Sequence, residues 1–143
     1  MGDEAWRFLS THPSDIVREW AAILVGLAED ITFARKLAWI KPFSDDEHSG
    51  FREIAWLALR AEVIRDPVHA IKCLVPWTGS RNERLRRYAS EITRPCGVWT
   101  SHIRQLKEQP QLGLPILEPL LADESKSVHT QYIVRRAVRT LKK

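Results

Sequence analysis

Apolar residues recur at helical spacing along most of the chain. Ile54, Leu57 and Ala58 fall on one face of a helix, and Phe33 and Leu37 do so in an earlier segment. No segment shows the alternation of apolar and polar residues that is typical of a half-buried strand. The pattern predicts helices over residues 14–26, 30–41, 50–64, 66–75, 81–93, 99–108, 113–121 and 127–141.

Two sequence marks repeat along the chain. The first, an apolar residue followed by Arg, a charged residue, an apolar residue and Ala, occurs at 17–21, 51–55 and 85–89, so its copies lie 34 residues apart. The second, a proline followed by a bulky apolar residue, occurs at positions 42, 76 and 119, at intervals of 34 and 43 residues. Leu85 and Val128 are also 43 residues apart. The marks predict helix-pair repeats with a period of 34, the third lengthened to 43.

The repeated pattern distinguishes between two kinds of helix-pair repeat. A period of 34 residues is also that of tetratricopeptide repeats, but their Trp-x-x-Leu-Gly signature is absent. What recurs is a polar turn followed by an apolar residue and Arg. We therefore predict an all-α fold, an α-solenoid of HEAT-like helix-pair repeats, in a single domain over residues 1–143.

The charge of the chain is unevenly distributed. Residues 1–80 carry 9 Lys and Arg against 12 Asp and Glu, whereas residues 81–143 carry 13 against 6. The basic half indicates an anionic partner. Arg18, Arg52 and Arg86 recur with the repeat, and two interpretations stay open for them. They form ion pairs with acids of the neighbouring repeat, such as Asp15, Asp45 or Asp46, or they form a ladder that binds phosphates.

Arginines are well suited to phosphate oxygens because the guanidinium group presents forked donors. The residues that we predict to contact DNA are Arg52, Arg86, Arg87, Arg94, Arg104, Arg135, Arg136 and Arg139.

Six tryptophans are many for 143 residues. Trp20, Trp39 and Trp56 are predicted to belong to the core, because aromatic residues at helical spacing usually do. Trp99 is different, since it follows a helix-breaking stretch that contains Pro95 and Gly97. A loop there could present the indole ring to a ligand.

Metal, disulfide and membrane chemistry are not indicated. Cys73 and Cys96 form no Cys-x-x-Cys pattern and the histidines are scattered, so we expect neither a metal site nor another cofactor. The first residues do not resemble a secretion signal, and no apolar run is long enough to cross a bilayer. These features favour a reduced cytoplasmic protein that does not bind membranes and, if it binds DNA, associates with the nucleoid.

The segment 85–99, Leu-Arg-Arg-Tyr-Ala-Ser-Glu-Ile-Thr-Arg-Pro-Cys-Gly-Val-Trp, closely resembles a segment of the alkylpurine DNA glycosylases built from HEAT-like repeats, the DNA alkylation repair family. Residues 50–56 and 115–123 also look like parts of that family, so the resemblance covers roughly residues 15–128. It implies a protein that binds alkylated double-stranded DNA and hydrolyses the bond between a cationic alkylated purine and deoxyribose. We expect the chain to be a monomer. Glu53 and Trp99 match the family's acidic and aromatic catalytic positions.

The sequence departs from the family after residue 122. The family has a helix there that opens with an Asn-Trp-Leu-Asn-Asp-like stretch, whose aspartate contributes to catalysis. Here Val128 runs directly into residues that resemble the family's extreme C-terminus, so about one helical repeat is missing. Either this form binds DNA without cutting it, or Glu53 alone serves as the catalytic carboxylate.

Two other classes of protein stay open. A protein-binding solenoid would use its groove for a peptide or an acidic partner and would lock its arginines in internal pairs. An RNA-binding helical repeat would need a stacking aromatic at one position of every repeat, and the tryptophans do not recur in that way.

Overall fold

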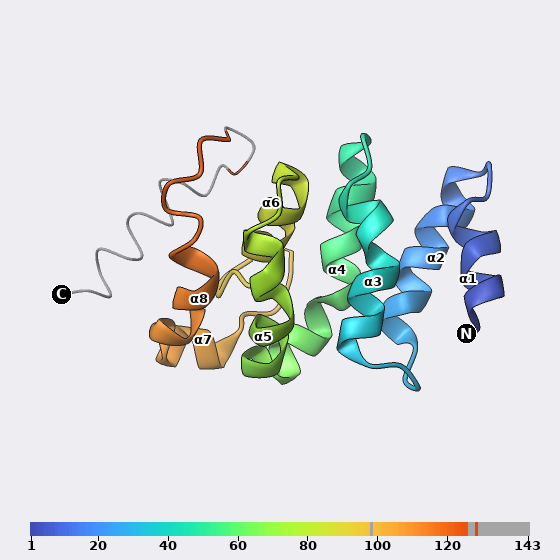
Figure 1. Ribbon diagram of the computed structural model, residues 1–143. Helices are drawn as coiled ribbons and strands as arrows, with labels where there is room; N and C mark the ends of the chain where they lie inside the picture. Colours follow the sequence, from blue (N-terminus) through green and yellow to red (C-terminus); the bar gives the residue numbers. More distant parts are fainter. Residues whose placement is uncertain (98, 126–127, 129–143) are drawn as a thin grey trace. The chain divides into compact units, whose positions relative to one another are not determined.

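The computed structural model describes residues 1–97, 99–125 and 128. Every regular element within these residues is a helix, which confirms the all-α prediction for this part of the chain (Figure 1). The chain divides into two compact units, Met1–Ala61 and Glu62–Lys143.

The first unit contains α1 (Asp3–Ser10), α2 (Asp15–Leu27), α3 (Phe33–Ser44) and the first part of α4 (Ser49–Arg65). Helix α1 was not predicted, because its eight residues contribute only Trp6 to the core and are fewer than the roughly 11 residues over which apolar periodicity is recognised. The Trp6 ring stacks on Trp39 at a centroid distance of 5.7 Å and meets Phe43 edge-on at 5.5 Å. These aromatic contacts fix α1 to α3.

Helix α2 packs tightly against α4. It turns Ala21, Ala22 and Val25 inward, and none of these three is exposed. A Cβ atom at Gly26 would overlap the carbonyl oxygen of Ala58, so only glycine fits at this point of the contact. Small side chains thus allow the two backbones to approach closely.

The core prediction for the tryptophans is correct for one residue of three. Trp39 is buried and Trp56 is half-buried. The prediction is wrong for Trp20, since 64% of this residue is exposed. The reason is that α2 buries the face that carries Ala21 and Val25, and Trp20 lies on the other face.

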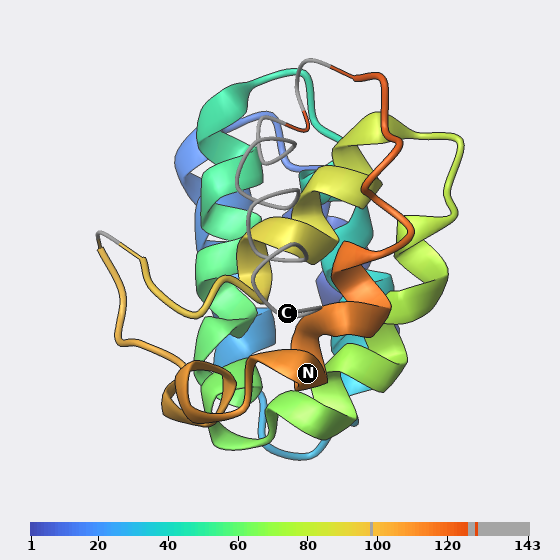
Figure 2. The same cartoon turned by 90° about the vertical axis from the view of Figure 1, so that its left-hand side faces the viewer.

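The second unit contains the end of α4, α5 (Pro67–Thr78), α6 (Glu83–Ile92), α7 (Arg104–Glu108), a 3-10 turn (Pro110–Gly113) and α8 (Leu114–Leu117). Helices α5, α6 and α8 contact one another (Figure 2). Asp66 and Asn82 cap the starts of α5 and α6 by accepting backbone N–H donors. The buried residues that join these helices are Ile71, Leu74, Tyr88, Ile92, Ile116 and Leu120.

The third helix pair is less regular than predicted. The helix expected over 99–108 is present only as α7, because Pro95 and Gly97 lie in a loop that continues to residue 103. The helix expected over 113–121 is present as the short helix α8 after a 3-10 turn. The last predicted helix, 127–141, lies outside the described residues except for Val128.

Candidate functional site

The three repeated arginines make the same contact. Each donates a hydrogen bond from its guanidinium to the carbonyl oxygen six residues earlier, in the loop before its helix. The donor to acceptor distances are 3.2 Å from Arg18 to His12, 2.7 Å from Arg52 to Asp46 and 2.9 Å from Arg86 to Ser80. Arg52 and Arg86 also reach the carbonyl oxygen five residues earlier. These arginines therefore close the loops between successive helices.

Two of the arginines also pair with acids, Arg18 within its own helix and Arg86 with an acid 37 residues later. Arg18 forms an ion pair with Asp15 at 2.7 Å, and its guanidinium lies 4.8 Å from the centre of the Phe51 ring. Arg86 binds Asp123 with two hydrogen bonds, of 2.5 Å and 3.1 Å. Such a forked contact fixes both side chains.

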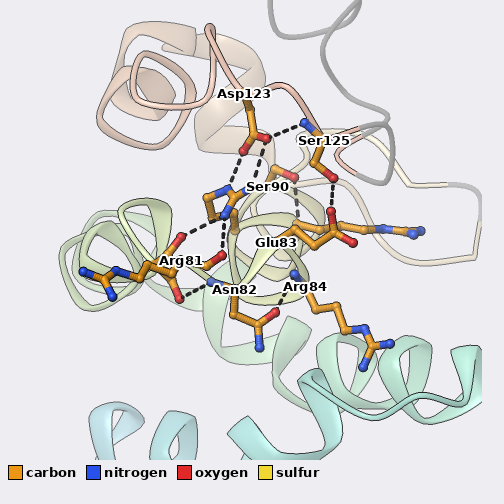
Figure 3. A network of polar contacts seen from close by, with 10 residues as sticks. Arg81, Asn82, Glu83, Arg84, Ser90, Asp123 and Ser125 are labelled. Atoms are coloured by element: carbon orange, nitrogen blue, oxygen red, sulfur yellow. Dashed lines mark hydrogen bonds and ion pairs between the residues drawn. The ribbon is translucent and has the colours of Figure 1, made fainter.

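Asp123 connects the turn after α8 to the start of α6 (Figure 3). Its side chain is 4% exposed, and it also accepts a hydrogen bond from the backbone N–H of Ser125 at 2.9 Å. The Ser125 hydroxyl donates to Glu83. The hydrogen bond from Arg86 lowers the pKa of Asp123 below its ordinary value, although burial opposes the shift.

The loop between α6 and α7 holds the most exposed tryptophan of the described residues. The loop leaves the end of α6 and returns to α7 (Figure 2), and a hydrogen bond of 2.9 Å from the Ile103 N–H to the Pro95 carbonyl oxygen closes it. Ile103 and Leu106 are buried at its returning end. Trp99 is 87% exposed, as expected for an indole available to a ligand.

The segment that contains Trp99 is strongly basic. Residues 81–107 hold seven Arg and Lys residues but only two acids, Glu83 and Glu91. Arg104 in this segment forms an ion pair with Glu108, and 89% of the Arg104 side chain is exposed. Lys107 is exposed too, with its Nζ 3.2 Å from the Nδ1 of His102. The segment can therefore present several cations and an indole ring to an anionic partner.

The two predicted catalytic residues lie in different units. Glu53 belongs to α4 in the first unit, is exposed, and accepts a hydrogen bond of 2.9 Å from the Trp56 indole nitrogen. Trp99 belongs to the second unit. Glu91 is the acid at the end of α6, immediately before the Trp99 loop, and pairs with Arg94 at 2.9 Å. Glu91 was not among the catalytic residues predicted from the sequence.

The other predicted DNA contacts have different surroundings. Arg87 is half-buried on α6, and the Arg94 side chain is 38% exposed. Residues 135, 136 and 139 lie outside the described residues. In the described part of the chain, no three His, Cys, Asp or Glu side chains gather as a metal site would require. No helix in that part is both long and apolar enough to cross a membrane.

The chain is similar to a protein of Bacillus subtilis (strain 168) that is described as "Uncharacterized protein YhaZ". The two sequences are 34% identical over an aligned length of 117 residues. The match covers 60% of this chain and 33% of the relative. The chain thus spans about one third of the length of this curated relative. No family model and no solved structure matches the chain.

Proposed function

We propose that this chain is a HEAT-like α-solenoid that binds double-stranded DNA and removes cationic alkylated purines from it. The observation that carries the proposal is the segment 81–107, in which an 87% exposed indole lies among an excess of five positive charges. The resemblance of residues 85–99 to DNA alkylation repair proteins falls within the same segment. The identical loop contacts of Arg18, Arg52 and Arg86 support the repeat architecture.

The exposed cations are assigned to the DNA backbone. Arg81, Arg104 and Lys107 are exposed, so they can reach phosphate oxygens without breaking buried contacts. Arg52 and Arg86 donate to loop carbonyl oxygens, and we assign them the role of holding the loops. Contacts of this kind bind DNA of any sequence, which suits a protein that must find damaged bases wherever they occur.

The chemistry requires little of the protein because the lesion is already cationic and leaves readily. Breaking the bond between base and sugar builds positive charge on the sugar ring, and the face of the Trp99 indole stabilises nearby positive charge. A carboxylate stabilises the same charge and orients the water that attacks the sugar. Glu53 and Glu91 are the two candidates for this carboxylate, the first from the family resemblance and the second from its place beside the Trp99 loop.

Release of free base from duplex DNA that carries methylated purines tests the proposal. We expect release by the parent chain, with loss in Trp99→Ala and in either Glu53→Gln or Glu91→Gln. Glu108→Gln is the matched control, because Glu108 is an exposed acid directly after this segment and forms an ion pair with the exposed Arg104. DNA binding without release would leave a non-catalytic DNA-binding relative. The absence of both would favour a protein-binding solenoid.

A further inference from the structure

Helix α2 exposes an apolar face that nothing in the described residues covers. Ile16, Trp20, Ile23 and Leu27 follow one another at intervals of four, three and four residues, the spacing of a seam between paired helices. Their exposed fractions are 61%, 64%, 46% and 69%. Leu24 widens this face and is 43% exposed. We call these five residues the α2 stripe.

The α2 stripe is unusual for a surface helix. A surface helix ordinarily has polar residues on its solvent-exposed face, and a helix that is apolar all round is ordinarily buried. The opposite face of α2 is buried already, since Ala21, Ala22 and Val25 have no exposure. Contiguous exposed apolar residues of this kind mark interaction sites.

Acidic residues border the α2 stripe. Glu19 lies beside it on the helix, and Glu29 and Asp30 follow the end of the helix. Arg18 is directed elsewhere, toward Asp15, the His12 carbonyl oxygen and the Phe51 ring. The border is therefore negative beside the N-terminal half of the stripe, at Glu19, and after its C-terminal end, at Glu29 and Asp30.

This charge distribution excludes several possible occupants. DNA and anionic membranes would be repelled by the acids. A second copy that paired its own α2 antiparallel to this one, with Ile16 opposite Leu27, would bring Asp15 of each helix close to the acids that follow Leu27 in the other. A second copy that offered its other unit would bring one large exposed apolar residue, Trp99, among those that the structure describes there.

We propose that the α2 stripe binds an amphipathic helix of another protein, with an apolar seam and Lys or Arg on its flanks. The stripe is about 16 Å long, since it covers eleven helical steps of about 1.5 Å each, so the partner helix needs at least three turns. Apolar burial supplies the affinity, and the acids select a basic helix over an acidic one. This partner site is separate from the proposed DNA-binding segment and does not depend on it.

The test uses two labelled synthetic peptides of about 14 residues, a length of about four helical turns. Both have a leucine seam, one with lysine and the other with glutamate flanks. Fluorescence anisotropy should show binding of the lysine peptide to the full chain. Affinity should fall at least about tenfold in Trp20→Asp and in Leu27→Asp, as it does when a central interface residue is lost. The matched control, Trp99→Asp, changes an exposed apolar residue of the other unit and should bind normally.

Charge reversal distinguishes a specific binding site from nonspecific hydrophobic binding. Glu19→Lys combined with Glu29→Lys should weaken the lysine peptide and strengthen the glutamate peptide. Circular dichroism should show the helical content of the parent in every variant, because the changed side chains are not part of the core. Equal binding of the two peptides to the parent would overturn the proposal. So would a dimer in solution that Trp20→Asp converts to a monomer, since the occupant would then be a second copy.

Discussion

At the scale of single residues, Asp123 joins the turn after α8 to the start of α6. Its carboxylate accepts two hydrogen bonds from Arg86 and one from the Ser125 backbone. We predict that Asp123→Asn lowers the free energy of unfolding by about 2 kcal/mol, because a largely buried charged hydrogen bond is lost. Urea denaturation at pH 7 measures this. Glu108→Gln should change it by less than about 0.5 kcal/mol, because its pair with Arg104 is exposed.

The same carboxylate predicts a dependence on pH. Arg86 holds the pKa of Asp123 in the folded chain below its ordinary value. The contribution of the pair is therefore complete above the unfolded pKa of about 3.9 and is lost as the pH falls through the lower folded pKa. We expect the stability difference between the parent chain and Asp123→Asn to be constant from pH 7 to 5 and to shrink below pH 4. A difference that grew on acidification would contradict this.

Single residues also show where sequence reasoning reaches its limit. The spacing of Trp20 fits a buried helix face, and so does that of Ala21 and Val25 on the other side of α2. When both faces of a helix are apolar, periodicity cannot tell which one the fold covers. The exposure of Trp99 was predictable, because Pro95 and Gly97 exclude a regular helix before it.

At the scale of elements, the contact between α2 and α4 depends on Gly26. We predict that Gly26→Ala lowers the free energy of unfolding by about 2 kcal/mol, because the added methyl group overlaps the Ala58 carbonyl oxygen. This cost outweighs the gain of about 1 kcal/mol in helix propensity. Thermal or urea unfolding provides the measurement. Gly79→Ala is the matched control and should be close to neutral, since its added methyl group meets only the Pro76 carbonyl oxygen at 3.9 Å.

Loop closure by the repeated arginines can be separated from DNA binding. Arg52 donates to two carbonyl oxygens of the loop before α4. We predict that Arg52→Gln lowers the free energy of unfolding by about 2 kcal/mol. At a temperature where the variant is still folded, its affinity for DNA should match the parent's. Lys41→Gln, which changes an exposed cation of the same unit, should alter neither quantity. Weaker DNA binding with unchanged stability would contradict this and would indicate that Arg52 contacts DNA.

The elements that sequence could predict are those with a long apolar period. The predicted segments 14–26, 50–64 and 81–93 correspond closely to α2, α4 and α6. Helix α1 was missed because it is short and is held in place by Trp39 and Phe43 of α3, which are distant from it in the sequence. The helical content after α6 was overestimated, since short helices and turns replace the two expected helices.

At the scale of the whole molecule, the uneven charge is the feature that the proposed function depends on. The first 80 residues are acidic and the remainder is basic, so the two parts suit partners of opposite charge. Glu53 and Trp99 belong to separate units, and nothing in the sequence indicated this.

Salt-dependent binding of duplex DNA tests the central claim most directly. The parent chain is compared with Arg104→Gln combined with Lys107→Gln, and with the control Arg7→Gln combined with Lys41→Gln, in which two exposed cations of the first unit are removed. Each lost phosphate contact should reduce the slope of log affinity against log salt by about 0.9, so the first double variant should lose about 1.8. The control should keep the parent's slope. Equal slopes in all three chains, or no binding at low salt, would contradict DNA recognition by the segment 81–107.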